Sequence, residues 1–234
     1  MWVLRMAWRS SGRDNASLVE ELTRNGLVSS RRVQRAMLAV DRGYFCAHQP
    51  YQDSPQSIGY NVTISAPHMH AMCLENLKDY LQEGCVALDV GSGSGYLTAC
   101  MAVMCGGTGK VYGVEHIPEL VDLSVENVMK SNPELLDPSD EASGNVEFVC
   151  GDGREGLAES GPFDCIHVGA ASEKVPQTLL EQLKCPGRLI IPVGTYHQDL
   201  LQVTRDKDGR FTEKVICGVR YVPLTDRDKQ LRDG

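Results

Sequence analysis

Apolar residues near the start of the chain recur at the spacing of an amphipathic helix. They stand at positions i, i+3, i+4 and i+7, namely Val33, Ala36, Met37 and Val40. This period predicts a helix with one side toward a core, and Ser29 or Ser30 can cap its start. An earlier helix is expected over residues 15–25, where Gly26 can take the left-handed conformation that ends a helix. Residues 45–67 show no period and are expected to form an irregular loop, too long for an idle connection.

After residue 67, short apolar runs of strand length alternate with helix-compatible segments. Strands are expected over 86–90, 111–114, 146–149, 165–168 and 188–192, and helices over 68–81, 94–104, 118–130 and 175–183. This alternation predicts an α/β, Rossmann-like fold with a mostly parallel twisted sheet and helices on both faces. Past residue 196 the helices are expected to stop, and 200–204 and 215–222 predict a C-terminal β-hairpin that turns at Asp208-Gly209.

The length of 234 residues suits one sizeable domain, so 1–234 is interpreted as a single domain. Within it, 1–16 is interpreted as an N-terminal extension, 132–144 as a surface insertion and 226–234 as a tail. The chain has 31 acidic and 23 basic residues and a net charge of −8, which argues against nucleic acid as a partner. No window approaches the ~20 apolar residues of a membrane helix, so no membrane contact is expected.

Cysteine usage indicates a reducing compartment. The chain has nine cysteines, an odd number, and several stand in apolar strand-like runs, where a free thiol acts as a small hydrophobic group. No pair shows C-x-x-C spacing, so no metal site is expected. The cytosol is the expected location.

A glycine-rich turn follows the strand predicted over 86–90. It reads L-D-V-G-S-G-S-G from Leu88 to Gly95, and a predicted helix comes next. Such a turn lets a nucleotide approach the backbone closely. The dinucleotide fingerprint G-x-G-x-x-G needs glycine at position 96, where this chain has Tyr96, so the spacing favours S-adenosyl-L-methionine over a nicotinamide cofactor. Asp89 agrees, because a carboxylate suits a cationic amino group better than a pyrophosphate.

Two acids stand at the ends of the next predicted strands. Glu115 comes 20 positions after Gly95 (115 − 95), where an acid can accept hydrogen bonds from both ribose hydroxyls. Asp152, within G-D-G at 151–153, is placed to meet the adenine amino group at the carboxyl edge of the sheet. Either acid alone could be a solvated or turn residue, but the glycine turn and the acids together favour a cofactor site.

The segment from Thr63 to His70 reads T-I-S-A-P-H-M-H and resembles the hallmark of the protein-L-isoaspartate O-methyltransferase family. Further segments resemble the same family at 89–98, 164–171 (D-C-I-H-V-G-A-A), 192–194 (P-V-G) and 221–226 (Y-V-P-L-T-D). They follow the family order from about residue 17 to 230. The resemblance implies a class I methyltransferase that uses S-adenosyl-L-methionine, releases S-adenosyl-L-homocysteine and methylates the free carboxylate of L-isoaspartyl and D-aspartyl residues in damaged proteins and peptides.

The resemblance also implies roles for individual residues. The implied catalytic residue is Ser65, and the implied substrate-binding residues are Ser65, Val168, Gly169 and Ala170. The residues implied to bind the cofactor are Val62, Thr63, Ile64, Ser65, His70, Asp89, Gly91, Ser94, Gly95, Glu115, His116, Gly151, Asp152, Thr225 and Gln230. From the residues alone, Ser65 could equally cap a helix that begins near Pro67, and His70 could be an ordinary partly buried histidine. Many members of the family have aspartate where this chain has Glu115, a change that keeps the carboxylate.

The implied reaction needs no strong general base. A carboxylate acceptor has an ordinary pKa of about 4 and is ionised at neutral pH, so a site that orients it through Ser65 suffices, without a Cys-His or Ser-His-Asp set. The methyl ester would collapse to a succinimide without an enzyme. A monomer is expected, because a damaged loop must enter an open cleft.

Two alternatives remain open at this point. The chain could be a class I methyltransferase with another small or protein substrate, or a non-catalytic adaptor that keeps the cofactor fold. Adaptors that resemble this family tend to have long C-terminal extensions, whereas this chain stops nine residues after Thr225 (234 − 225).

Overall fold

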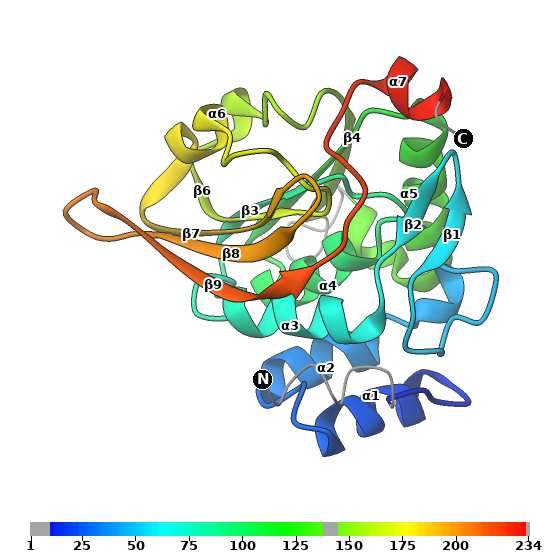
Figure 1. Cartoon of the computed structure of the whole chain (residues 1–234). Helices are drawn as coiled ribbons and strands as arrows, with labels where there is room; N and C mark the ends of the chain where they lie inside the picture. The colour runs from blue at the N-terminus through cyan, green and yellow to red at the C-terminus, as the bar shows by residue number, and fades with distance from the viewer. Residues whose placement is uncertain (1–9, 138–144, 233–234) are drawn as a thin grey trace.

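A seven-stranded sheet forms the centre of the computed structural model, which describes residues 10–137 and 145–232 (Figure 1). In sheet order the strands are β5 (Val146–Cys150), β4 (Lys110–Glu115), β3 (Val86–Val90), β6 (Phe163–Val168), β7 (Leu183–Gly194), β8 (Gln198–Arg205) and β9 (Phe211–Val219). The first five are parallel, and β8 and β9 extend the sheet in antiparallel pairs. The predicted mostly parallel sheet with a C-terminal hairpin is confirmed.

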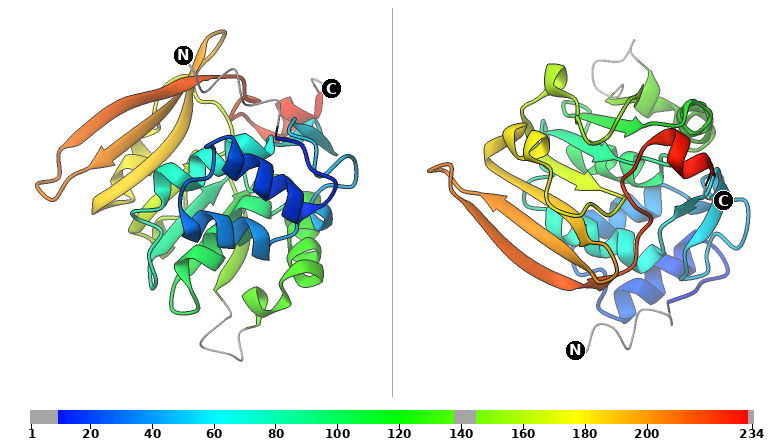
Figure 2. Two further views of the ribbon diagram at one scale, coloured as in Figure 1. Left: turned by 90° about the horizontal axis from the view of Figure 1, so that it is seen from below. Right: turned by 45° about the horizontal axis from the view of Figure 1, so that its top comes forward.

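Helices cover both faces of this sheet. They are α1 (Asn15–Arg24), α2 (Arg31–Ala39), α3 (Pro67–Leu77), α4 (Tyr96–Cys105), α5 (Pro118–Ser131) and α6 (Gln177–Glu181). A further short helix, α7 (Arg227–Arg232), has no buried residue. Side chains alternate along β3, so Ala87 packs with residues of α1 to α4, whereas Leu88 and Val90 pack with Leu179 of α6. Two apolar clusters therefore lie on opposite faces, as the Rossmann-like prediction required. Figure 2 shows α1 and α2 as a second helical layer over α3 and α4.

Helix α4 begins directly after the glycine turn and is buried on all sides. Nine of its ten residues are buried, which explains why its sequence is apolar all round. Gly95 precedes it with φ 86°, and a Cβ there would come within 3.0 Å of Phe148 on β5. Glycine at this position therefore lets the turn enter α4 close to the sheet.

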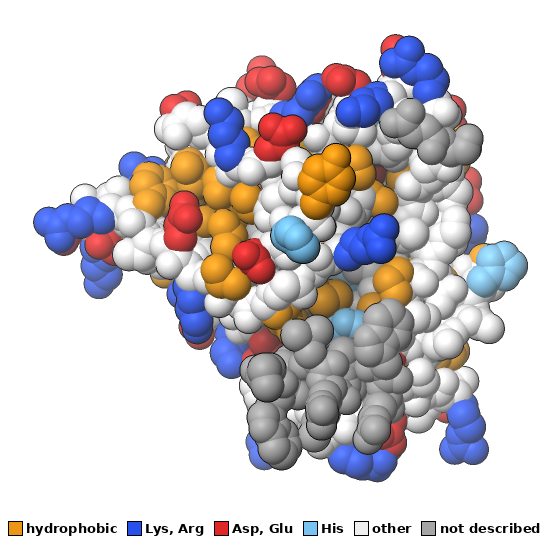
Figure 3. Space-filling model, viewed as in Figure 1, with side chains coloured by type: hydrophobic (Ala, Val, Ile, Leu, Met, Phe, Trp, Pro, Cys, Tyr) orange, Lys and Arg blue, Asp and Glu red, His pale blue; other side chains and the backbone are white. Residues whose placement is uncertain are grey.

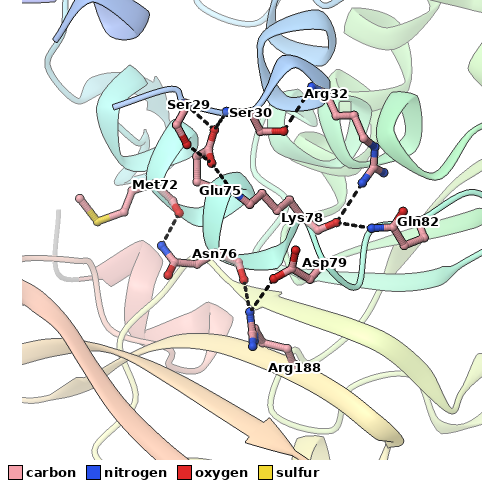
Figure 4. Close-up of polar contacts among 10 residues, drawn as sticks. All are labelled: Ser29, Ser30, Arg32, Met72, Glu75, Asn76, Lys78, Asp79, Gln82 and Arg188. Atoms are coloured by element: carbon pink, nitrogen blue, oxygen red, sulfur yellow. Dashed lines mark hydrogen bonds and ion pairs between the residues drawn. The ribbon is translucent and has the colours of Figure 1, made fainter. Parts of the chain in front are cut away.

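Polar contacts fix α3, the helix that begins within the T-I-S-A-P-H-M-H segment (Figure 4). On one side, Glu75 accepts hydrogen bonds from the backbone N–H groups of Ser29 (2.8 Å) and Ser30 (2.7 Å), just before α2. Arg32 Nη1 of α2 donates to the Lys78 carbonyl (3.0 Å). On the other side, Arg188 Nη1 of β7 donates to the Asn76 carbonyl (2.8 Å). Helix α3 is thus attached both to the outer helical layer and to the sheet.

The structure differs from the sequence prediction in two elements. Residues 45–67 are not wholly irregular, because β1 (Gln56–Gly59) and β2 (Val62–Ile64) pair as a short hairpin. The prediction that helices stop after residue 196 is wrong, because α7 forms near the end of the chain. None of the six residues of α7 is buried, so it has no apolar period by which to detect it.

The predicted extension and insertion are only partly described. Helix α1 begins at Asn15, inside the predicted extension 1–16, and a short 3₁₀ helix with buried Leu135 forms at Pro133–Leu136, inside the predicted insertion. Residues 138–144 of the insertion, residues 1–9 and residues 233–234 lie outside the described residues. Within residues 10–137 and 145–232, no helix is long and apolar enough to cross a bilayer.

Candidate active site

A cleft opens at the carboxyl ends of β3, β4 and β6, where ligands bind in open α/β sheets. It has two adjoining hollows, and Thr63, Gly91 and Gly169 line both of them. A Cβ on Gly169 would lie 3.0 Å from the Gly91 carbonyl oxygen. Backbone therefore forms this part of the cleft wall, and a ligand can approach it closely.

Most of the residues predicted for the site line these hollows. They are Val62, Thr63, Ile64, Ser65, His70, Asp89, Gly91, Ser94, Glu115, His116, Gly169, Ala170, Thr225 and Gln230. The others do not line either hollow, namely Gly95, Gly151, Asp152 and Val168. Val168 is fully buried in the apolar cluster beside α6, so its predicted contact with substrate has no support in this geometry.

Glu115 connects the end of β4 to the glycine turn. Its side chain is buried, and Oε1 accepts hydrogen bonds from the backbone N–H groups of His116 (2.8 Å) and Ile117 (3.2 Å). Its other oxygen, Oε2, accepts from the Gly93 N–H (3.2 Å). Oε1 thus uses both of its lone pairs, whereas Oε2 can accept one further hydrogen bond, so this carboxylate can hold a ligand hydroxyl while it keeps the turn in place.

Asp89 and His167 form a buried ion pair across the neighbouring strands β3 and β6. The two residues lie opposite each other in register, with Asp89 Oδ1 2.7 Å from His167 Nδ1, and Thr98 Oγ1 donates to Asp89 Oδ2 (2.6 Å). Burial by itself lowers the pKa of His167, but the nearby Cys73 thiol and the Asp89 carboxylate more than offset it and raise the pKa to about 10. The negative charge of Asp89 is therefore balanced inside the fold, and a cationic ligand group would join an existing pair.

The raised pKa of His167 predicts a pH-dependent stability. Because the folded pKa lies above the ordinary value of 6.5, the contribution of the pair is complete below pH 6.5 and is lost as the pH rises toward about 10. We expect a contribution on the order of a few kcal/mol at the acidic end of this window. Urea unfolding of the wild type and of His167→Gln should show a difference in unfolding free energy that shrinks with rising pH. A difference that stayed constant would contradict the charged state of His167.

Asp152 is engaged at the surface instead of in the cleft. Its carboxylate binds Arg154 through both oxygens (2.6 to 3.0 Å), and Arg154 Nη2 also donates to Asp226 (2.7 Å). The hydrogen bonds from Arg154 lower the pKa of Asp152. This network ties the loop after β5 to the segment before α7. The predicted contact of Asp152 with adenine stays a prediction.

Ser65 and His70 lie together on the side of the cleft formed by β2 and α3. The Ser65 carbonyl accepts a hydrogen bond from Arg42 Nη2 (2.8 Å), and His70 Nδ1 lies 3.1 Å from Nη1 of the same guanidinium. Burial, and then the charge of Arg42, lower the pKa of His70 well below its ordinary value, so its imidazole is neutral. The alternative role of Ser65 as a helix cap is not seen, because the N-cap of α3 is Ala66 and no side chain caps it.

The C-terminal segment covers part of the cleft. Gln230 of α7 lines the first hollow, and its Oε1 is 3.0 Å from His116 Nε2. Asn61 Nδ2 donates to the Gln230 carbonyl (2.8 Å), and Gln230 Nε2 donates to the Tyr60 carbonyl (3.2 Å). Figure 2 shows the result, with α7 beside the β1–β2 hairpin. The C-terminal helix and the β1–β2 hairpin thus meet beside the first hollow.

Further residues line the cleft that the sequence did not single out. They are Ser92, Gly93, Tyr96, Leu97, Val114, Gly153, His167, Val222, Pro223 and Leu224. Among the described residues, the buried Ser92 hydroxyl has no hydrogen-bond partner, as expected of a group that binds a ligand. Together with the glycine-lined wall, this orphaned hydroxyl fits a bound polar nucleotide derivative. His167 lies within the segment 164–171 that resembles the family, but its contact with Asp89 depends on the strand register, which the sequence did not reveal.

Proteins of one family resemble this chain over most of its length. The protein-L-isoaspartate(D-aspartate) O-methyltransferase family matches residues 13–229. Protein-L-isoaspartate O-methyltransferase 1 of Arabidopsis thaliana is 53% identical over 227 residues, which cover 95% of this chain and 96% of that relative. The protein-L-isoaspartate O-methyltransferase of Caenorhabditis elegans is 50% identical over 226 residues, 96% of this chain and 98% of that relative.

Solved structures agree with this assignment. A crystal structure from Plasmodium falciparum, assigned as a protein-L-isoaspartate O-methyltransferase and in complex with S-adenosyl-L-homocysteine, matches with a TM-score of 0.83 and 38% identity. The match covers 92% of this chain and 99% of that one. A second solved protein-L-isoaspartate O-methyltransferase matches with a TM-score of 0.75 and 27% identity, over 89% of this chain and 65% of the other. This chain therefore belongs to the protein-L-isoaspartate(D-aspartate) O-methyltransferase family.

Proposed function

We propose that this protein transfers a methyl group from S-adenosyl-L-methionine to the free carboxylate of L-isoaspartyl residues, and of D-aspartyl residues, in damaged proteins and peptides. One observation in the structure carries the proposal. Ser65 lines the hollow beside the glycine turn and also an outer hollow that Arg220 and Tyr221 help to form. A hydroxyl at the junction of two hollows can contact a carboxylate that enters from outside while the methyl donor lies within.

The first hollow and the glycine turn suit the cofactor. S-adenosyl-L-methionine supplies an electrophilic methyl group when it is bound. Glu115 offers its Oε2 atom to a ribose hydroxyl, and Thr225 and Gln230 line the same hollow. In the second hollow Ser92 and Ser94 offer hydroxyl groups close to Asp89. The residues of the two hollows thus provide a place for each part of an elongated, cationic nucleoside.

The polar side chains of the second hollow can orient a carboxylate, but they do not need to remove a proton from it. His70 is neutral, and the Asp89 carboxylate is paired with His167, so neither serves as a strong free base. None is needed, because the acceptor carboxylate is ionised at neutral pH. The Tyr221 side chain interacts with that of Ser65, and burial raises the pKa of this phenol well above its ordinary value. The hydroxyl of Tyr221 therefore keeps its proton and can orient the Ser65 hydroxyl.

Outer hollows lead to Ser65 along the C-terminal segment. One of them is lined by apolar residues such as Met69, Met72 and Val219, together with Arg220. Tyr196, at 99% exposure, lies at its rim. Figure 3 shows basic and histidine side chains beside hydrophobic ones in the middle of this face. Such a surface suits an unfolded peptide segment, with apolar contacts for its side chains and a cation near its extra carboxylate.

The decisive experiment uses paired peptides that differ only in aspartate against isoaspartate. The full-length protein is incubated with labelled S-adenosyl-L-methionine and each peptide, and base-labile methyl ester is measured. We expect label on the isoaspartyl peptide alone. Equal labelling of both peptides would favour a methyltransferase with another specificity, and no label with normal cofactor binding would favour an adaptor.

The proposal also covers the oligomeric state of the protein and its location in the cell. We propose a monomer, because the hollows beside Ser65 must admit a segment of another protein. We propose the cytosol, because all nine cysteines are free thiols and six of them are buried in the fold as small apolar groups: Cys46, Cys73, Cys85, Cys100, Cys105 and Cys165.

A further inference from the structure

Arg42 is a fully buried arginine beside the second hollow, and its hydrogen bonds run to neutral groups. Nε donates to the Pro50 carbonyl (2.8 Å), Nη2 donates to the Ser65 carbonyl (2.8 Å), and Nη1 lies 3.1 Å from His70 Nδ1. The buried Asp53 carboxylate favours this charge through space but accepts none of these hydrogen bonds, and a charge in the interior is costly when neutral acceptors alone bind it. A contribution to stability therefore explains an arginine at this position poorly. Its contacts with Ser65 and His70, two residues of the site, explain it better.

The contact between Arg42 and His70 determines where the imidazole proton lies. A guanidinium has only donors, so at 3.1 Å the Nδ1 atom of His70 must accept and has no proton. The imidazole is neutral, since burial and the charge of Arg42 both lower its pKa. A neutral imidazole without a proton on Nδ1 has it on Nε2. His70 is thereby a hydrogen-bond donor through Nε2.

The Tyr96 ring packs against both the Arg42 guanidinium and the His70 imidazole. The Arg42 guanidinium carbon lies 5.3 Å from the centre of the Tyr96 ring, and the His70 ring centre lies 5.0 Å from it. A cation over an aromatic face is favourable, more so away from water. The guanidinium and the imidazole therefore both pack against one buried ring at the start of α4.

We propose that Arg42 is a positioning residue for methyl transfer, which holds the Ser65 carbonyl and fixes His70 as a neutral Nε2–H donor to a carboxylate in the second hollow. This inference rests on the proposed function. Two carboxylates are candidates, that of the methionine part of the cofactor and that of the isoaspartyl acceptor. The shared chemistry is a hydrogen bond from a neutral imidazole, which orients an anion without giving it a proton.

The first test needs no variant and no activity. Nitrogen-15 NMR of the imidazole groups in the intact wild-type protein distinguishes a protonated from an unprotonated ring nitrogen, and His70→Gln assigns the signal. We expect His70 to have its proton on Nε2 and an unprotonated Nδ1 at neutral pH. A proton on Nδ1, or a doubly protonated ring, would overturn the inference even if the protein methylates isoaspartyl peptides.

The second test is a double-mutant cycle with a matched control. Arg42→Lys keeps the charge but loses the forked donors, whereas Arg32→Lys makes the same change in a guanidinium that donates to the Lys78 and Met104 carbonyls (both 3.0 Å), away from the cleft. We expect Arg42→Lys to lower kcat/KM about 10- to 100-fold. Arg32→Lys should leave kcat/KM near the wild-type value, even where both variants lower Tm.

The cycle also separates positioning from general loosening of the fold. In a His70→Gln background, Arg42→Lys should have a much smaller effect on kcat/KM than in the wild type, because most of its action passes through His70. A raised KM for S-adenosyl-L-methionine would identify the cofactor carboxylate as the partner, and an effect confined to peptide KM or kcat would identify the acceptor. Fully additive losses in the cycle would overturn the role of Arg42.

Discussion

Glu115→Ala is expected to weaken binding of S-adenosyl-L-methionine by about 100-fold or more. The substitution removes the acceptor for three backbone N–H groups, those of Gly93, His116 and Ile117, as well as the proposed acceptor for a ribose hydroxyl. A hydrogen bond to a charged group contributes roughly 1.5–3 kcal/mol, and about 1.4 kcal/mol is a tenfold change in affinity. The glycine turn would also lose its link to the end of β4. Isothermal titration calorimetry with S-adenosyl-L-homocysteine measures the effect directly.

Two further variants test whether the loss of affinity in Glu115→Ala comes from the carboxylate at this position. Glu115→Asp keeps the carboxylate with a shorter reach. Its fold-increase in the Kd for the cofactor should be less than a tenth of the fold-increase caused by Glu115→Ala. Glu119→Ala removes an exposed acid from the first turn of α5 and should change the affinity little. If Glu115→Ala bound the cofactor as well as the wild type, the assignment of the first hollow to the nucleoside would be wrong.

The sheet could be predicted from the sequence because burial leaves a local signal. Residues 86–90 and 165–168 are apolar apart from Asp89 and His167, and in the structure they lie in two neighbouring strands that pair in register. The β1–β2 hairpin left no such signal, because its strands are three and four residues long and its turn uses Tyr60 and Asn61 with φ 53° and 59°. Non-glycine residues seldom adopt these angles, so the two central positions of the turn lack the glycine that usually indicates a hairpin.

Some residues of the site could likewise be predicted from local sequence signals, and others could not. Glu115 could be predicted because a strand end and a fixed distance from the glycine turn are properties of the chain itself. The partners of Asp89 and His70 could not, because His167 lies 78 positions from Asp89 and Arg42 lies 28 positions from His70. Such pairs arise from strand register and helix packing. The sequence therefore predicted which side chains meet the ligand better than which side chains hold them in place.

Ser65→Ala is expected to lower kcat about 100-fold while leaving cofactor affinity near the wild-type value. Ser65 lines both the second hollow and the outer hollow, and a reacting group that is misplaced by about 1 Å can lose about 100-fold in rate. The backbone should be unaffected, because the bond from Arg42 goes to the Ser65 carbonyl, which alanine retains. Single-turnover methylation of an isoaspartyl peptide at saturating cofactor measures the chemical step.

A matched control and a pH profile separate orientation from base catalysis at Ser65. Ser57→Ala removes an exposed hydroxyl from the neighbouring strand β1, outside both hollows, and should leave kcat unchanged. If Ser65 only orients an ionised acceptor, the wild-type rate should fall as the pH drops toward about 4, the ordinary pKa of a carboxyl group, and Ser65→Ala should lower the rate by the same factor at every pH. Unchanged turnover in Ser65→Ala would remove Ser65 from the mechanism. A factor that varied with pH would instead mean that the hydroxyl takes part in proton transfer, which the neutral His70 and the paired Asp89 beside it are not arranged to support.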